Sequence, residues 1–107
     1  MPPPPAEVEV RENPERLRYE AWVDGRLAGA TFYTVKGDRL TFTHTEVNPE
    51  FEGRGVGSAL ARAALTDARD TGRLVVPLCP FIASYIARHP EFTDIVPSES
   101  RHRIRAS

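Results

Sequence analysis

The sequence has little of several residue types, and each shortage excludes a class of protein. Its 107 residues include one cysteine, so no internal disulfide can form. No apolar run approaches the roughly 20 residues that span a bilayer, and the first residues lack the basic start and apolar core of a signal peptide. The net charge is only −1, which gives no general case for nucleic-acid binding. We therefore expect a cytoplasmic protein with no membrane or nucleic-acid partner.

The composition that remains is that of one small globular domain. Apolar residues make up 40% of the chain and charged residues 27%, which suits a soluble fold with one modest core. The charge is unevenly divided: residues 1–53 hold 10 acidic and 6 basic side chains, and residues 54–107 hold 5 and 8. The basic half would help a polyanionic ligand dock, although three of its arginines belong to a polar tail.

Alternation of apolar and polar residues predicts four strands in the first half of the chain. They run over about 6–12, 17–24, 26–35 and 40–47 and are joined by short turns. The polyproline start, residues 1–5, is expected to be an extended, disordered tail, and residues 97–107 a frayed polar tail. Residues 6–96 are then the folded domain.

The second half of the chain changes to helices and one buried strand. Small residues at four-residue spacing predict a helix over 57–70, and a continuous apolar run at 74–78 predicts a buried strand. Pro80 suits the first turn of a second helix, which Pro90 ends. The order predicts an α/β (α+β) fold with a mixed, mostly antiparallel sheet and a right-handed parallel crossover. Because Pro77 cannot donate to a ladder, the last two strands should part near it.

The most informative stretch is the glycine-rich connection between the fourth strand and the first helix. Three glycines precede or begin the helix, where free backbone N–H groups and the helix dipole favour an anion. Glycine also lets the backbone approach a bulky ligand closely. A plain strand-to-helix turn is the alternative. The residues expected at this anion site are Gly53, Arg54, Gly55, Val56, Gly57 and Ser58.

Around this connection the chain resembles the GCN5-related N-acetyltransferase superfamily, and in particular its small, single-domain branch. The superfamily's pyrophosphate loop reads Gln/Arg-x-x-Gly-x-Gly/Ala after a strand. Here that pattern falls on residues 52–57, with Glu52 in the Gln/Arg position and a basic residue at Arg54 instead. The resemblance covers residues 7–95 and also rests on His44-Thr45-Glu46-Val47, Leu78-Cys79-Pro80-Phe81 and residues 85–90.

This resemblance implies acetyl-CoA, or coenzyme A, as the cofactor. Its pyrophosphate would lie on the N–H groups of residues 54–58, and its pantetheine arm would pair with the main chain of Val47 in the gap between the parting strands. It also implies an N-acetyltransferase whose acceptor is a primary amine, on a small molecule or on a protein lysine or N-terminus. The superfamily usually has two helices between its first two strands. The turn at 13–15 leaves no room for them, so the identity of the acceptor does not transfer.

Three residues outside the loop are candidates for catalysis on their own chemistry. Cys79 precedes Pro80 and would cap the second helix, where a thiolate is favoured. It could attack acetyl-CoA to form an acyl-enzyme, line the thioester pocket during direct transfer, or be a small buried apolar residue. Glu46 or His44, placed on one strand face with Leu40 and Phe42, could act as the base, or be polar groups at a strand end.

Tyr85 is a fourth candidate, because the resemblance implies a tyrosine there that protonates the leaving thiolate. A core-facing aromatic is the alternative. His89 has no Cys, His or carboxylate partner at metal spacing, so no metal is expected. Two rival functions stay open: a non-catalytic acyl-CoA binding or sensing module, and a structural interaction domain. A monomer or a weak homodimer suits a chain of this size.

Overall fold

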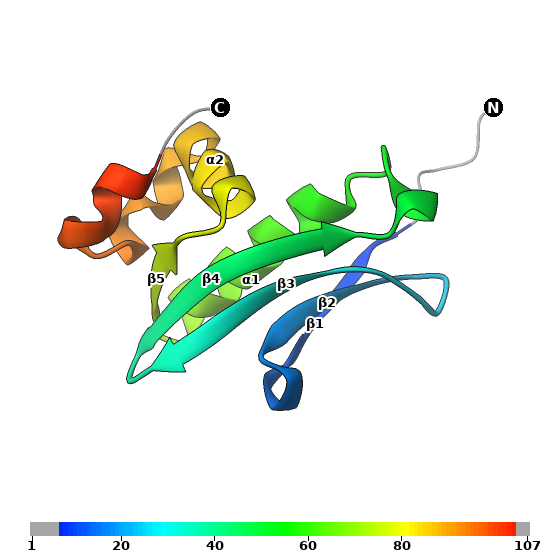
Figure 1. Cartoon of the computed structure of the whole chain (residues 1–107), viewed down its shortest axis with the longest axis horizontal. Helices are drawn as coiled ribbons and strands as arrows, with labels where there is room; N and C mark the ends of the chain where they lie inside the picture. The colour runs from blue at the N-terminus through cyan, green and yellow to red at the C-terminus, as the bar shows by residue number, and fades with distance from the viewer. Residues whose placement is uncertain (1–6, 105–107) are drawn as a thin grey trace.

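A computed structural model of the chain describes residues 7–104. It contains five strands, two α-helices and four short 3-10 helices (Figure 1). In chain order these are β1 (Glu9–Asn13), η1 (Pro14–Arg16), β2 (Arg18–Val23), β3 (Arg26–Lys36), β4 (Arg39–Val47), η2 (Pro49–Phe51), α1 (Val56–Asp70), β5 (Leu74–Pro77), α2 (Pro80–Arg88), η3 (Pro90–Ile95) and η4 (Ser98–Arg103). The tail predicted at residues 1–5 lies outside the described residues.

The five strands form one sheet in the order of the chain. The first three junctions are antiparallel and β4 pairs with β5 in parallel. Helix α1 connects the parallel pair and lies along one face of the sheet (Figure 1). The predicted mixed, mostly antiparallel sheet with a parallel crossover is therefore confirmed. No helix within residues 7–104 is long and apolar enough to cross a membrane.

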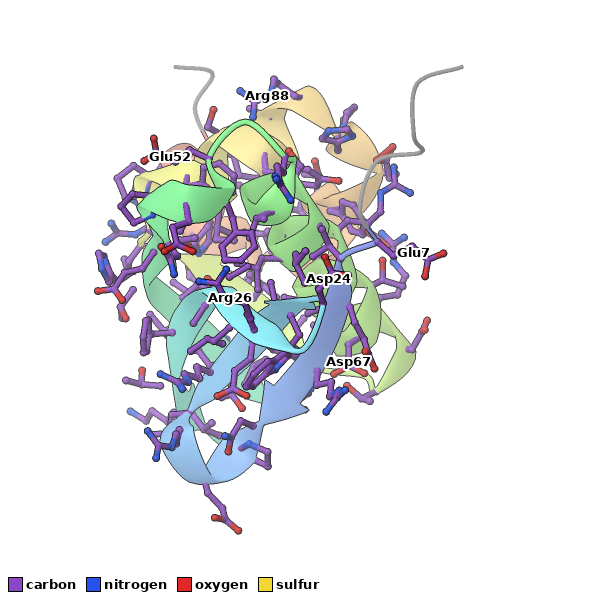
Figure 2. The ribbon with its side chains drawn as sticks, turned by 90° about the vertical axis from the view of Figure 1, so that its right-hand side faces the viewer. Glu7, Asp24, Arg26, Glu52, Asp67 and Arg88 are labelled. Carbon is purple, nitrogen blue, oxygen red and sulfur yellow. The ribbon has the colours of Figure 1, made fainter. Side chains whose placement is uncertain are left out.

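Local sequence accounts for the turns between the strands. Asp24 and Gly25 both adopt positive φ angles, of 50° and 75°, as a two-residue hairpin turn of type I′ requires. Figure 2 looks onto the end of the molecule that carries this turn and the connection between β4 and α1. Between β1 and β2 there is only η1, whose start is capped by Asn13 accepting a hydrogen bond from the Arg16 N–H. The connection between β1 and β2 therefore places no α-helix on the sheet face opposite α1.

The core lies between the sheet and α1, and small residues let the two approach closely. Ala61, Ala64 and Ala68 of the helix are fully buried, together with larger residues such as Leu60. On the strand side the approach depends on Gly29. A Cβ there would lie 2.6 Å from a backbone carbonyl of β4 and within 3.4 Å of two α1 side chains. Only glycine fits this position.

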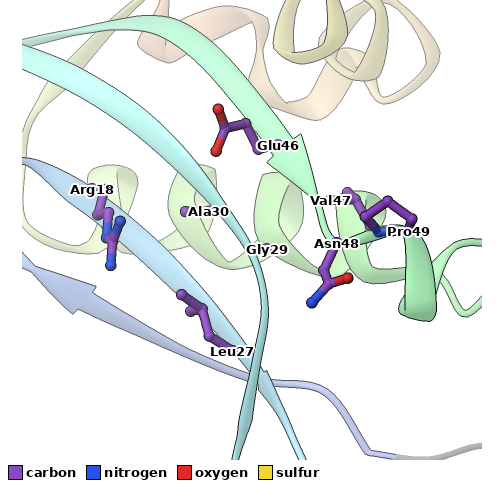
Figure 3. Close-up of a pocket in the computed structure, with 8 residues that line it drawn as sticks. All are labelled: Arg18, Leu27, Gly29, Ala30, Glu46, Val47, Asn48 and Pro49. Carbon is purple, nitrogen blue, oxygen red and sulfur yellow. The ribbon is translucent and has the colours of Figure 1, made fainter.

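A β-bulge in β4 reverses the face to which its side chains point. Tyr33 pairs with Phe42 but Phe32 pairs with His44, so Thr43 is an extra residue without a partner. Because side chains alternate along a strand, the residues that follow change faces. Phe42 is buried beneath α1, whereas His44 and Glu46 are exposed on the uncovered face. Figure 3 shows Glu46 on that face. The predicted placement of His44 and Glu46 on one face with Leu40 and Phe42 was wrong, because the extra residue Thr43 inverts the alternation of side chains after Phe42.

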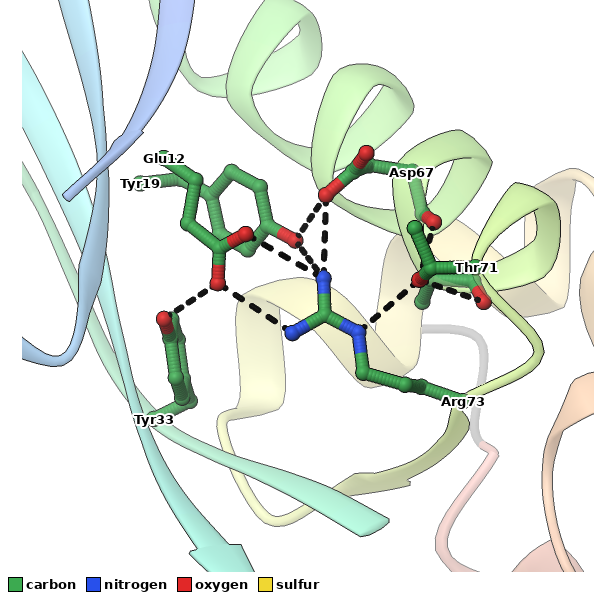
Figure 4. A network of polar contacts seen from close by, with 7 residues as sticks. Glu12, Tyr19, Tyr33, Asp67, Thr71 and Arg73 are labelled. Carbon is green, nitrogen blue, oxygen red and sulfur yellow. Dashed lines mark hydrogen bonds and ion pairs between the residues drawn. The ribbon is translucent and has the colours of Figure 1, made fainter. Parts of the chain in front are cut away.

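A polar network ties the first strands to α1 and to the connection before β5 (Figure 4). The Arg73 guanidinium donates to Glu12, to the Tyr19 hydroxyl at 2.8 Å and to Asp67 at 3.0 Å. Tyr19 donates to Asp67, and Tyr33 donates to Glu12. Burial raises the pKa of the Glu12 carboxyl, but its hydrogen bonds with Arg73 and Tyr33 lower it by more, so this pKa lies below its usual range.

The C-terminal segment is more ordered than its composition indicated. Residues 98–103, which we expected to fray, form η4. Val96 and Ser100 are buried, and Glu99 pairs with Arg39 of β4 at 2.8 Å. This segment therefore packs on the end of the sheet where β4 and β5 are still paired.

We expect Glu12→Gln to lower the free energy of unfolding at neutral pH by about 1–3 kcal/mol, because Arg73 loses one of its two carboxylate partners in a half-buried site. Since the folded pKa of Glu12 is depressed, its contribution is complete above the ordinary value of 4.5 and is lost as the pH falls through the folded pKa. Urea unfolding from neutral pH down to about pH 3 should thus show a shallower acid dependence in the variant.

The exposed Glu15→Gln variant on η1 is the matched control and should leave both quantities unchanged. If Glu12→Gln kept the wild-type acid dependence, the network would not carry the stability assigned to it.

Candidate functional site

Strands β4 and β5 separate after four residue pairs, the last of which joins Phe42 to Pro77. Beyond it the Leu78 N–H turns back to the Val76 carbonyl at 3.2 Å, and the Cys79 N–H donates to the Phe42 carbonyl at 2.8 Å. Pro77 has no N–H with which to continue the ladder. Within the described part of the chain, residues 43–47 of β4 consequently have no partner strand on this side, as predicted from Pro77.

The backbone of Val47 faces this gap. The Asn48 N–H donates to the Ala28 carbonyl at 2.8 Å, so the pair formed by Gly29 and Val47 lies between two ladder hydrogen bonds. In such a pair the backbone groups of both residues point away from each other. Those of Val47 are therefore free to pair with an extended ligand along the open edge of β4.

The glycine connection ends in an open helix N-terminus. Gly53 and Gly55 adopt left-handed φ angles of 80° and 75°, and Gly55 is the N-cap of α1 without a side-chain cap. In the described part of the chain, the N–H groups of Val56, Gly57 and Ser58 have no hydrogen-bond acceptor. The Val56 side chain is buried, so its contribution to an anion site is its N–H alone.

The N-termini of α1 and α2 meet at the mouth of the gap. Gly57 and Phe81 are each the second residue of their helix, and a Cβ on Gly57 would lie 2.8 Å from the tip of the Phe81 ring. Cys79 is the N-cap of α2, as predicted, and only 3% of it is exposed. The start of α1 is therefore in contact with the first turn of the helix that Cys79 caps.

The polar neighbour of the Cys79 thiol is a hydroxyl rather than a base. The Cys79 sulfur lies 3.3 Å from Thr45 Oγ1, which in turn lies 2.9 Å from Thr31 Oγ1. Within residues 7–104, no hydrogen bond links Cys79 to His44, Glu46 or Tyr85. The candidate nucleophile and the candidate bases are not assembled into one hydrogen-bonded group.

His44 and Glu46 instead form a pair on the uncovered face, with 3.1 Å between His44 Nε2 and Glu46 Oε1. His44 also stacks on Phe32. Glu46 is the acidic residue of a pocket of about 450 Å³ (Figure 3), whose walls include Arg18 and apolar side chains. Arg18 is held by Glu20 at 2.7 Å, so its charge is already balanced. The pocket thus offers one carboxylate beside an apolar wall.

Two further predicted residues lie apart from these groups. Tyr85 is buried, and its ring stacks on His89 with 4.0 Å between the ring centroids and also contacts Phe92 of η3. Arg54 is exposed beside the Phe51 ring, and among the described residues it makes no ion pair. Its neighbour Arg26 is paired with Glu50. Arg54 is therefore a positive charge just before α1 that no carboxylate of the described residues neutralises.

Sequence reasoning missed the residues that surround the thiol. Thr31 and Thr45 are 48 and 34 residues away from Cys79 along the chain, respectively, and no local pattern signals their contact. The packing of Phe81 on Gly57 was not predicted either. Because of the bulge at Thr43, the Thr45 side chain points to the same side of the sheet as Cys79. The sequence alone does not reveal this bulge.

The chain matches the sequence profile described as GCN5-related N-acetyl-transferase over residues 18–95, which is more than half of its length. Among solved structures it is similar to a GCN5-like protein from Staphylococcus aureus, classed with the N-acetyltransferases. The identity is 20%, the TM-score is 0.62, and 83% of this chain and 87% of that chain are covered. This likeness shows the fold.

A second solved structure, a nourseothricin acetyltransferase, is 41% identical over 52% of this chain and 35% of that chain, with a TM-score of 0.41. At that score the likeness carries no structural argument. None of the curated proteins matches the sequence.

Replacement of Gly29 by alanine should destabilise the strand pair that bears Val47. The new Cβ would sit 2.6 Å from the Glu46 carbonyl oxygen, so β3 and β4 would have to move apart. We expect Gly29→Ala to lower the free energy of unfolding by about 1–3 kcal/mol in urea titrations. The exposed Thr34→Val change on the same strand serves as control. Unchanged stability in Gly29→Ala would contradict this close packing.

Proposed function

The chain belongs to the GCN5-related N-acetyltransferase family, and on that premise we propose that it transfers the acetyl group of acetyl-CoA to a primary amine. The observation that carries the proposal is the meeting of two helix N-termini at the mouth of the gap between β4 and β5. One terminus offers free N–H groups and the other holds the thiol. An elongated ligand with a polyanionic end and a thioester end matches this arrangement.

The start of α1 would hold the pyrophosphate of the cofactor. The N–H groups of Val56, Gly57 and Ser58 are open, and the left-handed glycines before them keep the approach clear of side chains. The helix dipole contributes roughly 0.3–1 kcal/mol per charge. Arg54 adds a positive charge that no other described residue neutralises.

The open edge of β4 would take the pantetheine arm as if it were a further strand. Val47 directs its backbone groups to the unpaired side of β4, and Cys79 follows β5 across that side. A pantetheine arm that pairs with this edge would bring its thioester beside the thiol. Backbone donors along the edge would then polarise the thioester carbonyl.

The pocket beside Glu46 would receive the amine from the uncovered face. In direct transfer Glu46 takes a proton from the ammonium, the amine nitrogen forms a bond to the carbonyl carbon, and the carbon–sulfur bond breaks. Coenzyme A leaves as a thiolate and is protonated through Tyr85 or water, and this proton is balanced by the second one that the nitrogen loses as the amide forms. In transfer through Cys79, the Cys79 thiolate first displaces coenzyme A, and the amine then attacks the acyl-cysteine.

Thermal unfolding tests the cofactor. Acetyl-CoA or coenzyme A at 100 times its dissociation constant should add about 2.7 kcal/mol of stability. In a domain of this size that raises the midpoint by roughly ten degrees or more, and ATP at the same concentration should not. Arg54→Glu should raise the dissociation constant of the cofactor about three- to tenfold.

The matched control is Arg62→Glu, an exposed change within α1, which should bind the cofactor as the wild type does. The absence of any shift with acetyl-CoA and coenzyme A at millimolar concentration would overturn the proposed function.

Cys79→Ala separates catalysis from binding. We expect it to keep cofactor affinity. Transfer to amines should fall by about a hundredfold or more if the acetyl group passes through Cys79, as removal of a reacting group does, and by much less in direct transfer. Mass spectrometry of the wild type after acetyl-CoA without amine distinguishes the routes, because only transfer through Cys79 leaves an acetyl group on that residue. Full activity of Cys79→Ala would contradict its role, and binding without turnover of any amine would favour an acyl-CoA sensing module.

A further inference from the structure

Strand β1 leaves one side of its backbone open at the edge of the sheet. Within residues 7–104 its only partner strand is β2, which in turn pairs with β3. The Tyr33 N–H donates to the Leu17 carbonyl at 3.0 Å, so every second residue from Leu17 onward directs its backbone groups to β3. The residues between them direct theirs to β1, and these are Arg18, Glu20 and Trp22.

The register of β1 with β2 then determines which backbone groups are open. The partners of those three β2 residues are Asn13, Arg11 and Glu9, whose backbone groups therefore face β2. Val10 and Glu12 alternate with them, so their N–H and carbonyl groups point outward from the edge. In the described part of the chain no hydrogen bond uses these outward groups. An open edge of this kind is a template for another strand.

The charges along β1 match a second copy of the same strand. When two copies run antiparallel with Val10 opposite its counterpart, Glu9 of each copy lies opposite Arg11 of the other. Both side chains are exposed, and within one chain they form an ion pair of 3.0 Å. Opposite charges at cross-strand positions attract each other. A twofold axis through Val10 therefore produces two attractive pairs between the strands.

Other registers of the two strands bring like charges together. The smallest shift that keeps the outward backbone groups paired moves the second strand by two residues. The twofold axis then passes through Glu9 or through Arg11, and that residue lies opposite its own copy. Like charges directly opposite each other destabilise a strand pair. The charges of β1 therefore favour the register that is centred on Val10.

An open groove of about 630 Å³ lies between β1 and α1, and its charges also suit a second copy. The apolar part of its lining is formed by Val8, Val10, Ala59 and Ala63. Arg62 and Asp70 line it eight residues apart along α1, and within residues 7–104 neither has an ion-pair partner. The twofold axis reverses the direction of the second α1. The basic part of each groove would thus adjoin the acidic part of the other.

We infer that this surface is a dimer interface, in which β1 of two copies pairs antiparallel around Val10 and joins both sheets into one. The partner is a second copy of this chain, and each copy contributes the same surface. The shared ladder covers only residues 8–12, so the dimer should be weak and its population should depend on protein concentration.

The dimer leaves the candidate functional site open. β1 and β5 are the two opposite edges of the sheet, so the gap between β4 and β5 faces away from the second copy. The inference therefore goes beyond the proposed function and does not rest on it.

The test is the mass of the full chain in solution, measured by sedimentation from micromolar to millimolar concentration. The mass of the wild type should rise from 11.9 kDa toward twice that value. Glu9→Arg and Arg11→Glu each place like charges opposite each other at two positions. We expect either change alone to raise the dissociation constant of the dimer about tenfold or more.

Two further samples test the pairing itself. The double variant Glu9→Arg with Arg11→Glu exchanges the two charges and should restore the wild-type dissociation constant to within about threefold. An equal mixture of the two single variants should form heterodimers at concentrations where neither dimerises alone. In that mixture each strand meets charges of the opposite sign.

Amide hydrogen exchange locates the contact without a substitution. The N–H groups of Val10 and Glu12 should exchange more slowly at the higher protein concentration, because they become donors in the shared ladder. The matched control for the charge changes is Asp38→Arg, in the exposed turn between β3 and β4, which should dimerise as the wild type does.

A wild-type chain that stays at 11.9 kDa at millimolar concentration would overturn the inference. Single charge variants that dimerise as the wild type does, or a dimer in which Val10 and Glu12 gain no protection, would overturn it as well. Failure of acetyl-CoA to raise the unfolding midpoint would count against the proposed function alone.

Discussion

The early end of pairing between β4 and β5 is the constraint on which the rest of the site depends. Pro77 has no N–H to give, and the next donor, at Leu78, turns back onto its own strand. The Cys79 N–H then closes the pairing at Phe42. One proline thereby opens the edge of β4, and the thiol that follows it lies at the start of α2, two residues before the Phe81 ring that packs on Gly57 of α1.

The bulge at Thr43 determines which side chains of β4 point to each face of the sheet. It turns Thr45 and Val47 toward α1 and leaves His44 and Glu46 on the face without helices. The proposed cofactor and the proposed amine would thus meet across a single strand, one along its edge and the other over its open face. Such an arrangement lets two ligands occupy the site together, which direct transfer requires.

Local chemistry explains what the sequence could predict. The order of strand, glycine loop and helix, the hairpin at Asp24 and Gly25 and the break at Pro77 each depend on neighbours in the chain. The faces of His44 and Glu46 could not be predicted, because one extra residue in β4 inverts an alternating pattern without changing its composition. The contact between Thr45 and Cys79 joins residues from separate elements, and only the folded sheet brings them together.

In the proposed complex the cofactor lies across the two helix N-termini and along the edge of β4. Amide ¹H–¹⁵N NMR spectra recorded during addition of acetyl-CoA test it most directly. We expect the signals of Val56, Gly57, Ser58 and Val47 to move together and saturate at one ligand concentration, while those of β1 remain in place. Shifts confined to β1 and the outer face of α1, or no shifts at all, would contradict it.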